Sequence, residues 1–382
     1  MSQIYLDYAA ATPMDPKVES AMGSYLGDNF YNPSATYLAA RAVRADLNEA
    51  RANVAAHFGC RPAEVVFTAG ATEANNLAIA GIMNLWPDGE VLATAVEHES
   101  VLAPVKKYPH KLIKVDARGR LDLAHLEELI GPKTVLVSIM HVNNEIGVLQ
   151  PIADIANLLN KLSKLRTEKG DKRPLYLHTD AAQSPNFFEL KVARLGVDLM
   201  TINGGKIYGP KQTGALFIKA GVKLSPQVIG GGQEFGVRSG TENVAGIIGL
   251  TVALQIAQRK HSSEAKRLSS LRQRFEAGLL ELAPEIKING SKKHRAPHIS
   301  SVTFPGTDNE RLMMELDEAG VMAAIGSACS ASSDEPSHVL SAIGLSAVDA
   351  RSTLRFSLGC PTTEAEIDYA VKTLKSILAQ KA

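Results

Sequence analysis

The stretch TVLVSIMHVNNEIGVLQPIADIANLLNKLSKLRTEKGDKRPLYLHTD, residues 134–180, decides how this 382-residue chain folds. Aliphatic runs open and close the stretch, and apolar residues recur at helical spacing between them, over 152–165. Strands that are apolar on both faces are typical of parallel sheets covered by helices. The stretch therefore predicts two strands of a mostly parallel sheet with a helix between them.

The same alternation of strand and helix patterns extends over most of the chain. Besides 134–140 and 174–180, β-branched and aliphatic runs predict strands at 64–68, 90–96, 111–115, 198–203 and 214–218. Helical patterns cover 34–59, 71–86 and 152–165. This order predicts an α/β doubly wound domain, with a mostly parallel seven-stranded sheet sandwiched by helices.

The texture of the sequence changes after a long helix expected at 242–282. The middle of that helix is polar (QRKHSSEAKR), which suits a helix that bridges two lobes. Beyond it, short strands mix with helices expected at 308–319 and 363–380, which predicts a smaller α+β domain. We assign 14–257 to the large domain, and 1–13 with 258–382 to the small one.

The composition excludes several classes of protein. Hydrophobic residues make up 45% and charged residues 21%, an ordinary globular mixture. A net charge of +1 gives no electrostatic case for binding nucleic acid or an anionic membrane. No apolar run is long enough to span a bilayer, and the N-terminus has no signal-peptide pattern. Three cysteines are too few for a disulfide framework and lack zinc-ligand spacing, so we expect a cytoplasmic protein without a metal.

A candidate anion site follows the expected strand at 64–68. The segment FTAGATEANN places Gly70, Ala71 and Thr72 between that strand and a helix. Free backbone amides and a hydroxyl at a helix N-terminus suit a phosphate group. The alternative is an ordinary helix cap by Thr72, which the segment alone favours.

Other strand ends carry further chemistry, and ligands of doubly wound sheets collect at the carboxyl ends of strands. Asp180 ends one strand and could also cap a following helix, while Lys206 lies in a glycine turn and could be idle. His98 and Asn144 follow two further strands, where structural roles are equally open. Together, an amine for a Schiff base, a carboxylate for a pyridinium nitrogen and a phosphate cradle predict pyridoxal phosphate.

Ten segments then show a resemblance that covers nearly the whole chain. The chain resembles the cysteine desulfurases, which are class-V aminotransferases within the fold-type I pyridoxal-phosphate enzymes. The segments, in order, are YLDYAAATP, NPSA, FTAGATEANNLAI, VEHESV, HVNNEIG, HTDAAQS, KIYGPK, GGGQEFGVRSGTENVAG, GSACSASSDEPSHVL and RFSLG.

The resemblance implies roles around the cofactor. Lys206 would bind the cofactor aldehyde covalently and assist proton transfer, and Asp180 would pair with the pyridine nitrogen. His98 would stack on the ring and take part in proton transfer. Asn144 and Gln183 would hydrogen-bond the ring substituents, Gln183 near the phenolic oxygen. The phosphate would be held by Ala71 and Thr72.

The resemblance also implies a substrate site and a second subunit. Arg355 would clamp the carboxylate of L-cysteine with its fork of donors, with Asn32 near that carboxylate. Thr241 would reach the phosphate of the neighbouring subunit, which implies a homodimer. Cys329, on a loop at about 326–336 in the small domain, would attack the substrate sulfur as a thiolate.

The implied activity is a sulfur transfer: L-cysteine would become L-alanine, and Cys329 would carry a persulfide. The length of the cysteine loop resembles the group that serves iron–sulfur assembly and tRNA thiolation, so an iron–sulfur scaffold or a tRNA-thiolation carrier would accept the sulfur. A selenocysteine lyase or another β-lyase on the same scaffold is the second possibility. A degenerate, non-catalytic scaffold is the third.

The chain departs from the family pattern at five positions. They are Asn203 for Ser, Gly205 for His, Tyr37 for His, Phe235 for Arg and Cys360 for Arg. The first two changes touch the phosphate, and each lost hydrogen bond to a charged group is worth about 1.5–3 kcal/mol. We hypothesise that Asn203, Thr72 and Thr241 carry the phosphate in this chain.

Overall fold

A seven-stranded sheet forms the centre of the molecule. The computed structural model describes residues 3–326 and 336–379. The strands follow the order β2-β8-β7-β6-β5-β3-β4, and β8 runs antiparallel to both of its neighbours while the other pairs are parallel. Their bounds are β2 Val65–Thr68, β3 Glu90–Thr94, β4 His110–Ile113, β5 Thr134–Ser138, β6 Tyr176–Asp180, β7 Leu199–Asn203 and β8 Gly214–Ile218.

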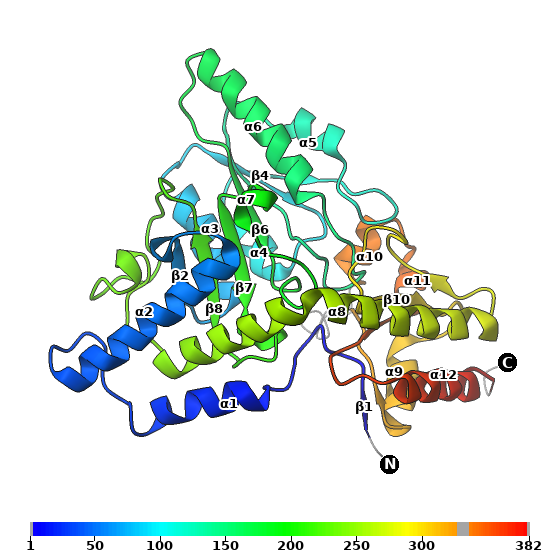
Figure 1. Cartoon of the computed structure of the whole chain (residues 1–382). Helices are drawn as coiled ribbons and strands as arrows, with labels where there is room; N and C mark the ends of the chain where they lie inside the picture. The colour runs from blue at the N-terminus through cyan, green and yellow to red at the C-terminus, as the bar shows by residue number, and fades with distance from the viewer. Residues whose placement is uncertain (1–2, 327–335, 380–382) are drawn as a thin grey trace.

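The strands are buried on both faces because helices cover the sheet on each side (Figure 1). Neighbouring residues of one strand belong to different hydrophobic clusters, Phe67 and Leu92 to one and Val66 and Val91 to the other. This alternation is the two-residue period of a strand, with both faces apolar. The helices are α1 Pro16–Gly23, α2 Leu38–Phe58, α3 Ala71–Met83, α4 Glu99–Val105, α5 Leu123–Leu129, α6 Ile152–Glu168 and α7 Val192–Leu195.

Two smaller sheets lie beyond the central one. Strands β9 Lys287–Ile288, β10 Ile299–Thr303 and β12 Thr353–Ser357 pair antiparallel, and β1 Ile4–Tyr5 pairs parallel with β11 Val321–Met322. Their side chains share a separate buried cluster with the nearby helices, so this part of the chain has a core of its own. The helices of this region are α9 Asn309–Glu318, α10 His338–Ala342, α11 Ala347–Ala350 and α12 Glu364–Ala379.

One helix, α8 Val244–Leu282, joins both regions (Figure 1). Its 39 residues span about 58 Å at 1.5 Å per residue. The helix belongs to the central core up to Ala257 and to the second core from Leu268 onwards. The polar stretch between these points is the one that the sequence predicts to bridge two lobes.

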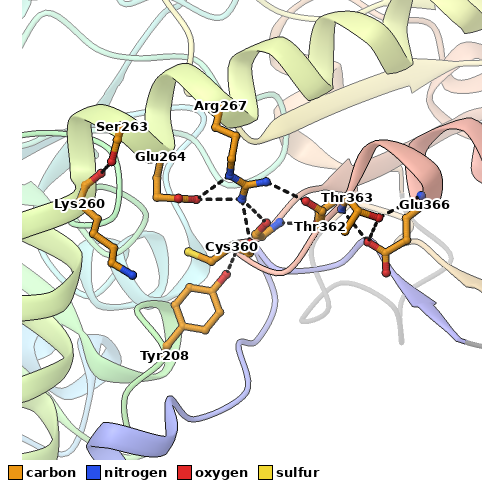
Figure 2. Close-up of polar contacts among 10 residues, drawn as sticks. Tyr208, Lys260, Ser263, Glu264, Arg267, Cys360, Thr362, Thr363 and Glu366 are labelled. Atoms are coloured by element: carbon orange, nitrogen blue, oxygen red, sulfur yellow. Dashed lines mark hydrogen bonds and ion pairs between the residues drawn. The ribbon is translucent and has the colours of Figure 1, made fainter.

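Arg267, in the middle of α8, forms hydrogen bonds with the turn between β12 and α12. Figure 2 shows its guanidinium between the Glu264 carboxylate, at 2.9 Å, and the carbonyl oxygens of Cys360 and Thr362, both at 2.8 Å. The phenol oxygen of Tyr208, from the central region, accepts a hydrogen bond from the backbone amide of Cys360 at 2.6 Å. The two regions are therefore held together by polar contacts as well as by the helix itself.

The described residues contain no helix whose length and apolar character would let it cross a bilayer. Within the same residues, no cluster of histidine, cysteine and acidic side chains could hold a metal ion.

Candidate active site

A cavity of about 270 Å³ opens at the carboxyl ends of β6 and β7. Seven short segments line it, although they are spread over some 350 positions of the sequence, because the parallel strands end at one edge of the sheet. Nine of the residues that the sequence predicts for the site line the cavity: Ala71, Thr72, His98, Asn144, Asp180, Gln183, Asn203, Lys206 and Arg355.

Asp180 is the last residue of β6 and is 6% exposed. Its Oδ2 accepts a hydrogen bond from Asn75 Nδ2 at 2.7 Å, and its Oδ1 accepts one from the amide of Ala182 at 2.9 Å. No helix begins directly after it, so the alternative of a helix cap is wrong. Two donors hold the carboxylate at the cavity wall, where it could accept a hydrogen bond from a cationic group.

Lys206 is held in a short 3-10 helix, η3 Gly204–Lys206, directly after β7. Its Nζ donates to the carbonyl oxygen of Ala10, and its own carbonyl accepts from Asn186 Nδ2 at 2.9 Å. A Cβ at Gly204 would lie 2.2 Å from Thr213 Oγ1, so this turn requires glycine. The tight packing fixes the point from which the lysine reaches the cavity.

The N-terminus of α3 lies where the sequence predicts a phosphate cradle. Its N-cap is Gly70, at φ +122°, and no side chain caps the helix, so the alternative of a cap by Thr72 is wrong. The hydroxyl of Thr68 fixes the loop by donating to the Gly70 carbonyl at 3.0 Å. Uncapped amides at Ala71 and Thr72 therefore lie at the cavity wall, where an anion would satisfy them.

Asn203 lies beside this cradle at the end of β7. Its Oδ1 accepts from the amide of Gly205 at 3.3 Å, which leaves the Nδ2 group to face other partners. A Cβ at Gly70 would lie 3.8 Å from the same Oδ1, so the two residues are neighbours. An amine, a carboxylate and an uncapped helix end thus share one cavity, and this donor set fits the phosphorylated aldehyde predicted from the sequence.

Arg355, on β12, is buried and lines the cavity from the second region. Its Nη2 forms an ion pair with Asp7 Oδ1 at 2.6 Å, and its Nη1 donates to the Asn144 carbonyl at 3.0 Å. Among the described residues, its buried Nε has no hydrogen-bond partner. A substrate carboxylate would satisfy this donor, which is otherwise costly to bury.

Two predicted site residues are not brought to this cavity. Asn32 and Thr241 are exposed and do not line it. Cys329 lies outside the described residues. The described residues on either side of it lie next to Glu145: a Cβ at Gly326 would lie 3.2 Å from Glu145 Oε2, and Ser337 Oγ donates to that oxygen at 2.6 Å.

Several side chains that support the site are not among those predicted from the sequence. Asn75 and Ser100 lie behind Asp180 and His98, and Asp7 pairs with Arg355. Asn75 could have been noticed as a polar residue within an otherwise apolar helical run. Asp7 left no such signal, because it is 348 positions away from its partner.

Three of the five departures lie away from the cavity. Tyr37 is 53% exposed, and Phe235 is 58% exposed and covers the guanidinium of Arg51 at 5.0 Å from its ring centre. Cys360 does not line the cavity, and its backbone amide donates to Tyr208 (Figure 2). Asn203 therefore remains the substitution with a direct bearing on the cavity, since it lines the wall and Gly205 contributes no side chain.

Glu97, directly before His98, is fully buried. Burial raises the pKa of its carboxyl to about 8, and the charge of Asp180 adds to the rise. Thr94 Oγ1 and the amide of Met140 donate to Oε1, while Oε2 has no partner within the described part of the chain. The native protein therefore holds this proton at neutral pH, where an unfolded glutamate is ionised.

The Glu97→Gln variant should respond differently to pH from the native protein. Between about pH 4.5 and 8, Glu97 is protonated in the folded protein and ionised in the unfolded chain. The free energy of unfolding therefore falls by up to about 1.4 kcal/mol for each pH unit that the pH rises. Glutamine keeps the Oε1 acceptor and stays neutral. In thermal unfolding, the melting temperature of the variant should rise relative to that of the native protein as the pH goes from 5.5 to 7.5. Parallel curves would contradict the buried proton.

Comparison with known proteins gives a consistent result. Residues 4–370 match the family described as Aminotransferase class-V. The cysteine desulfurase IscS of Dictyoglomus turgidum is 39% identical, over 98% of this chain and 94% of that protein. A solved NifS-like protein superposes with a TM-score of 0.91 at 31% identity, over 99% of this chain and 100% of that one. SspA, solved in complex with cysteine, superposes with a TM-score of 0.79 at 35% identity, over 93% and 98%.

Proposed function

The chain belongs to the class-V aminotransferase family and is a pyridoxal-phosphate-dependent cysteine desulfurase, and from this premise we propose how its own residues perform the reaction. When bound, the cofactor supplies the electron sink that stabilises negative charge at the substrate α-carbon. The main support for the assignment of residues is that nine of the expected side chains line one cavity.

Each residue of the cavity has a distinct task. Lys206 holds the cofactor through its amine and then moves a proton at the α-carbon of the substrate. Asp180 accepts a hydrogen bond from the ring nitrogen and keeps that nitrogen positively charged. Arg355 orients the substrate by its carboxylate, using the buried Nε that has no protein partner among the described residues.

The remaining residues hold the cofactor in place. Ala71 and Thr72 bind the phosphate at the N-terminus of α3, with Asn203 in support. His98 covers the ring, and Asn144 and Gln183 meet its substituents. Gln183 Nε2 donates to the Ala9 carbonyl at 2.9 Å, so its Oε1 is directed to accept from a ligand.

Cys329 completes the reaction by accepting the sulfur. The carbon–sulfur bond of L-cysteine breaks and a sulfur–sulfur bond to Cys329 forms, so the products are L-alanine and a persulfide on the enzyme. Because Gly326 and Ser337 both lie at Glu145, next to the cavity residue Asn144, the segment that carries Cys329 starts and ends beside the site.

A Cys329→Ser variant tests this assignment. We expect it to bind the cofactor normally and to lose most of the sulfide released from cysteine in the presence of a thiol reductant, because serine cannot carry a persulfide. Cys60→Ser and Cys360→Ser serve as matched controls and should retain the activity. Full sulfide release by Cys329→Ser would refute the role of the thiol, and alanine from selenocysteine but none from cysteine would favour a lyase.

We also propose that the active form is a homodimer. Thr241 and Asn32 are exposed, which suits residues that complete the site of a neighbouring subunit. Large apolar side chains are exposed on the same loops and at the start of α2, with Phe30 at 72%, Ile229 at 85% and Leu38 at 81%. Arg51, on α2, pairs with Glu234 at 2.6 Å and so connects that helix to the loop of Ile229 and Thr241, and Figure 1 shows both loops at one end of the molecule.

An Ile229→Asp variant should separate the subunits, because a charge would be buried at their contact. Light scattering should give the mass of two chains for the native protein and of one chain for the variant, with weaker cofactor binding through loss of Thr241. Val348→Asp, at a residue 73% exposed on α11, is the matched control and should keep the native mass. A native protein with the mass of a single chain would refute the dimer.

The sulfur acceptor is proposed on chemical grounds. A persulfide must be handed to a protein thiol or thiocarboxylate, and we propose an iron–sulfur scaffold or a tRNA-thiolation carrier in the cytoplasm. The small number of cysteines suits a reducing compartment. We further propose 14–257 as the large domain, with 1–13 and 258–382 as the small one, in line with the two separate cores.

A further inference from the structure

A continuous chain of hydrogen bonds runs along the wall of the cavity, with the side-chain amide of one buried residue at its centre. Asn75, on α3, is fully buried. Its Nδ2 donates to Asp180 Oδ2 at 2.7 Å and to Ser100 Oγ at 2.8 Å. An amide nitrogen carries two protons, so both are used, one for the carboxylate and one for the hydroxyl.

The chain continues to His98, which caps α4 with its imidazole. The backbone amide of Ser100 lies 3.1 Å from His98 Nδ1, and an amide can only donate, so Nδ1 accepts and carries no proton. Ser100 Oγ lies 2.8 Å from the same nitrogen. Because that oxygen already accepts from Asn75, its own proton is directed to Nδ1.

We propose that Asn75 and Ser100 are positioning residues that hold His98 as the tautomer protonated at Nε2 and connect its ring to the carboxylate of Asp180. Two donors at Nδ1 fix the rotation of the ring, and His98 lines the cavity. The nitrogen that carries the proton is therefore Nε2. This inference rests on the proposed function of the cavity for the identity of the ligand, and on the protein alone for the tautomer.

The arrangement assigns His98 and Lys206 different tasks. A ring that is protonated at Nε2, with Nδ1 saturated by donors, acts as a hydrogen-bond donor toward bound groups rather than as a base. Removal of a proton from the substrate then falls to Lys206. The same amide that orients His98 also orients Asp180, so a change at Asn75 disturbs the residues expected on the face and at the nitrogen of the cofactor ring.

The tautomer can be measured directly. Protein labelled with ¹⁵N-histidine should show, in a long-range ¹H–¹⁵N spectrum, a protonated Nε2 and an unprotonated Nδ1 for His98, with and without pyridoxal phosphate. A His98→Gln variant identifies the two signals. A native protein with the proton on Nδ1 would overturn the proposal. This spectrum needs no catalysis, so its outcome is independent of whether the cavity performs desulfuration.

Two variants test the positioning residues. Ser100→Ala keeps the backbone donor but removes the hydroxyl, so the Nδ1 signal of His98 should shift and the second tautomer should appear. Asn75→Ala should weaken pyridoxal phosphate binding to the cofactor-free protein about tenfold, through loss of a hydrogen bond to a charged group. Asn76→Ala, at the half-buried neighbour whose Nδ2 donates to the Thr72 carbonyl, is the matched control and should bind within twofold of the native protein.

An unchanged Nδ1 signal in Ser100→Ala would refute the role of Ser100. Native cofactor affinity in Asn75→Ala would refute the role of Asn75. If either variant fails to fold, the spectrum of the native protein still decides the tautomer on which both roles depend.

Discussion

A Lys206→Ala variant should lose turnover of cysteine by about 10⁴-fold or more. This one side chain provides both the covalent attachment of the cofactor and the proton transfer at the α-carbon, and a positioned acid–base group alone contributes about 10²–10⁴-fold. Asn186 and Thr213 hold the surrounding turn through backbone and packing contacts that alanine leaves intact. The fold of the variant should therefore be unchanged.

The measurement combines mass spectrometry with an activity assay. Borohydride treatment of the native protein should fix the cofactor to the peptide that contains Lys206, and the variant should remain unlabelled. Lys211→Ala is the matched control, because Lys211 follows five positions later and its Nζ donates to the Thr12 carbonyl at 2.7 Å, outside the cavity lining. Labelling of a different lysine in the native protein would refute the assignment.

An Asp180→Asn variant is the second change with a large expected effect, a loss of about 10²–10³-fold in kcat. The native carboxylate accepts from Asn75 at one oxygen and from the Ala182 amide at the other. Asparagine replaces one of these accepting oxygens with an NH2 group, which is a donor. One of the two hydrogen bonds is then lost, because two donors face each other. The negative charge that would face a ring nitrogen is lost as well.

The absorbance of the bound cofactor and the rate of alanine formation would report this change separately from folding. Asp198→Asn provides the control. Asp198 precedes β7 at the opposite end of the strand, where its carboxylate accepts from the amide of Leu177 and pairs with Lys219. That variant should retain native kcat. Native turnover in Asp180→Asn would show that the ring nitrogen needs no charged partner in this chain.

The sequence predicts the sheet well because its strands are apolar on both faces and end at polar residues. Asp180 and Lys206 could be predicted for the same reason, since each follows a strand of one parallel sheet. The expected strand at 90–96 stops at Thr94, because the chain turns there to bring Glu97 and His98 to their places. Strand ends are thus least predictable where they build the site.

The cap of α3 shows what local patterns cannot decide. Thr72 is a common capping residue, but the chain reaches the helix through Gly70 at a positive φ, a conformation set by tertiary contacts. The pairs Asp7 with Arg355 and Asn75 with Ser100 also depend on the fold, because they join segments that are distant in sequence. No spacing rule connects such residues before the sheet is assembled.

The uninterrupted course of α8 affects how this enzyme can be taken apart and recombined. A boundary near residue 258 falls inside a helix whose two halves serve two different cores. A gene cut at that point would leave each fragment with half of α8, ending at a broken helix end. The two regions therefore cannot be produced separately by cutting at a linker. Chimaeras between relatives should therefore exchange the whole helix or none of it.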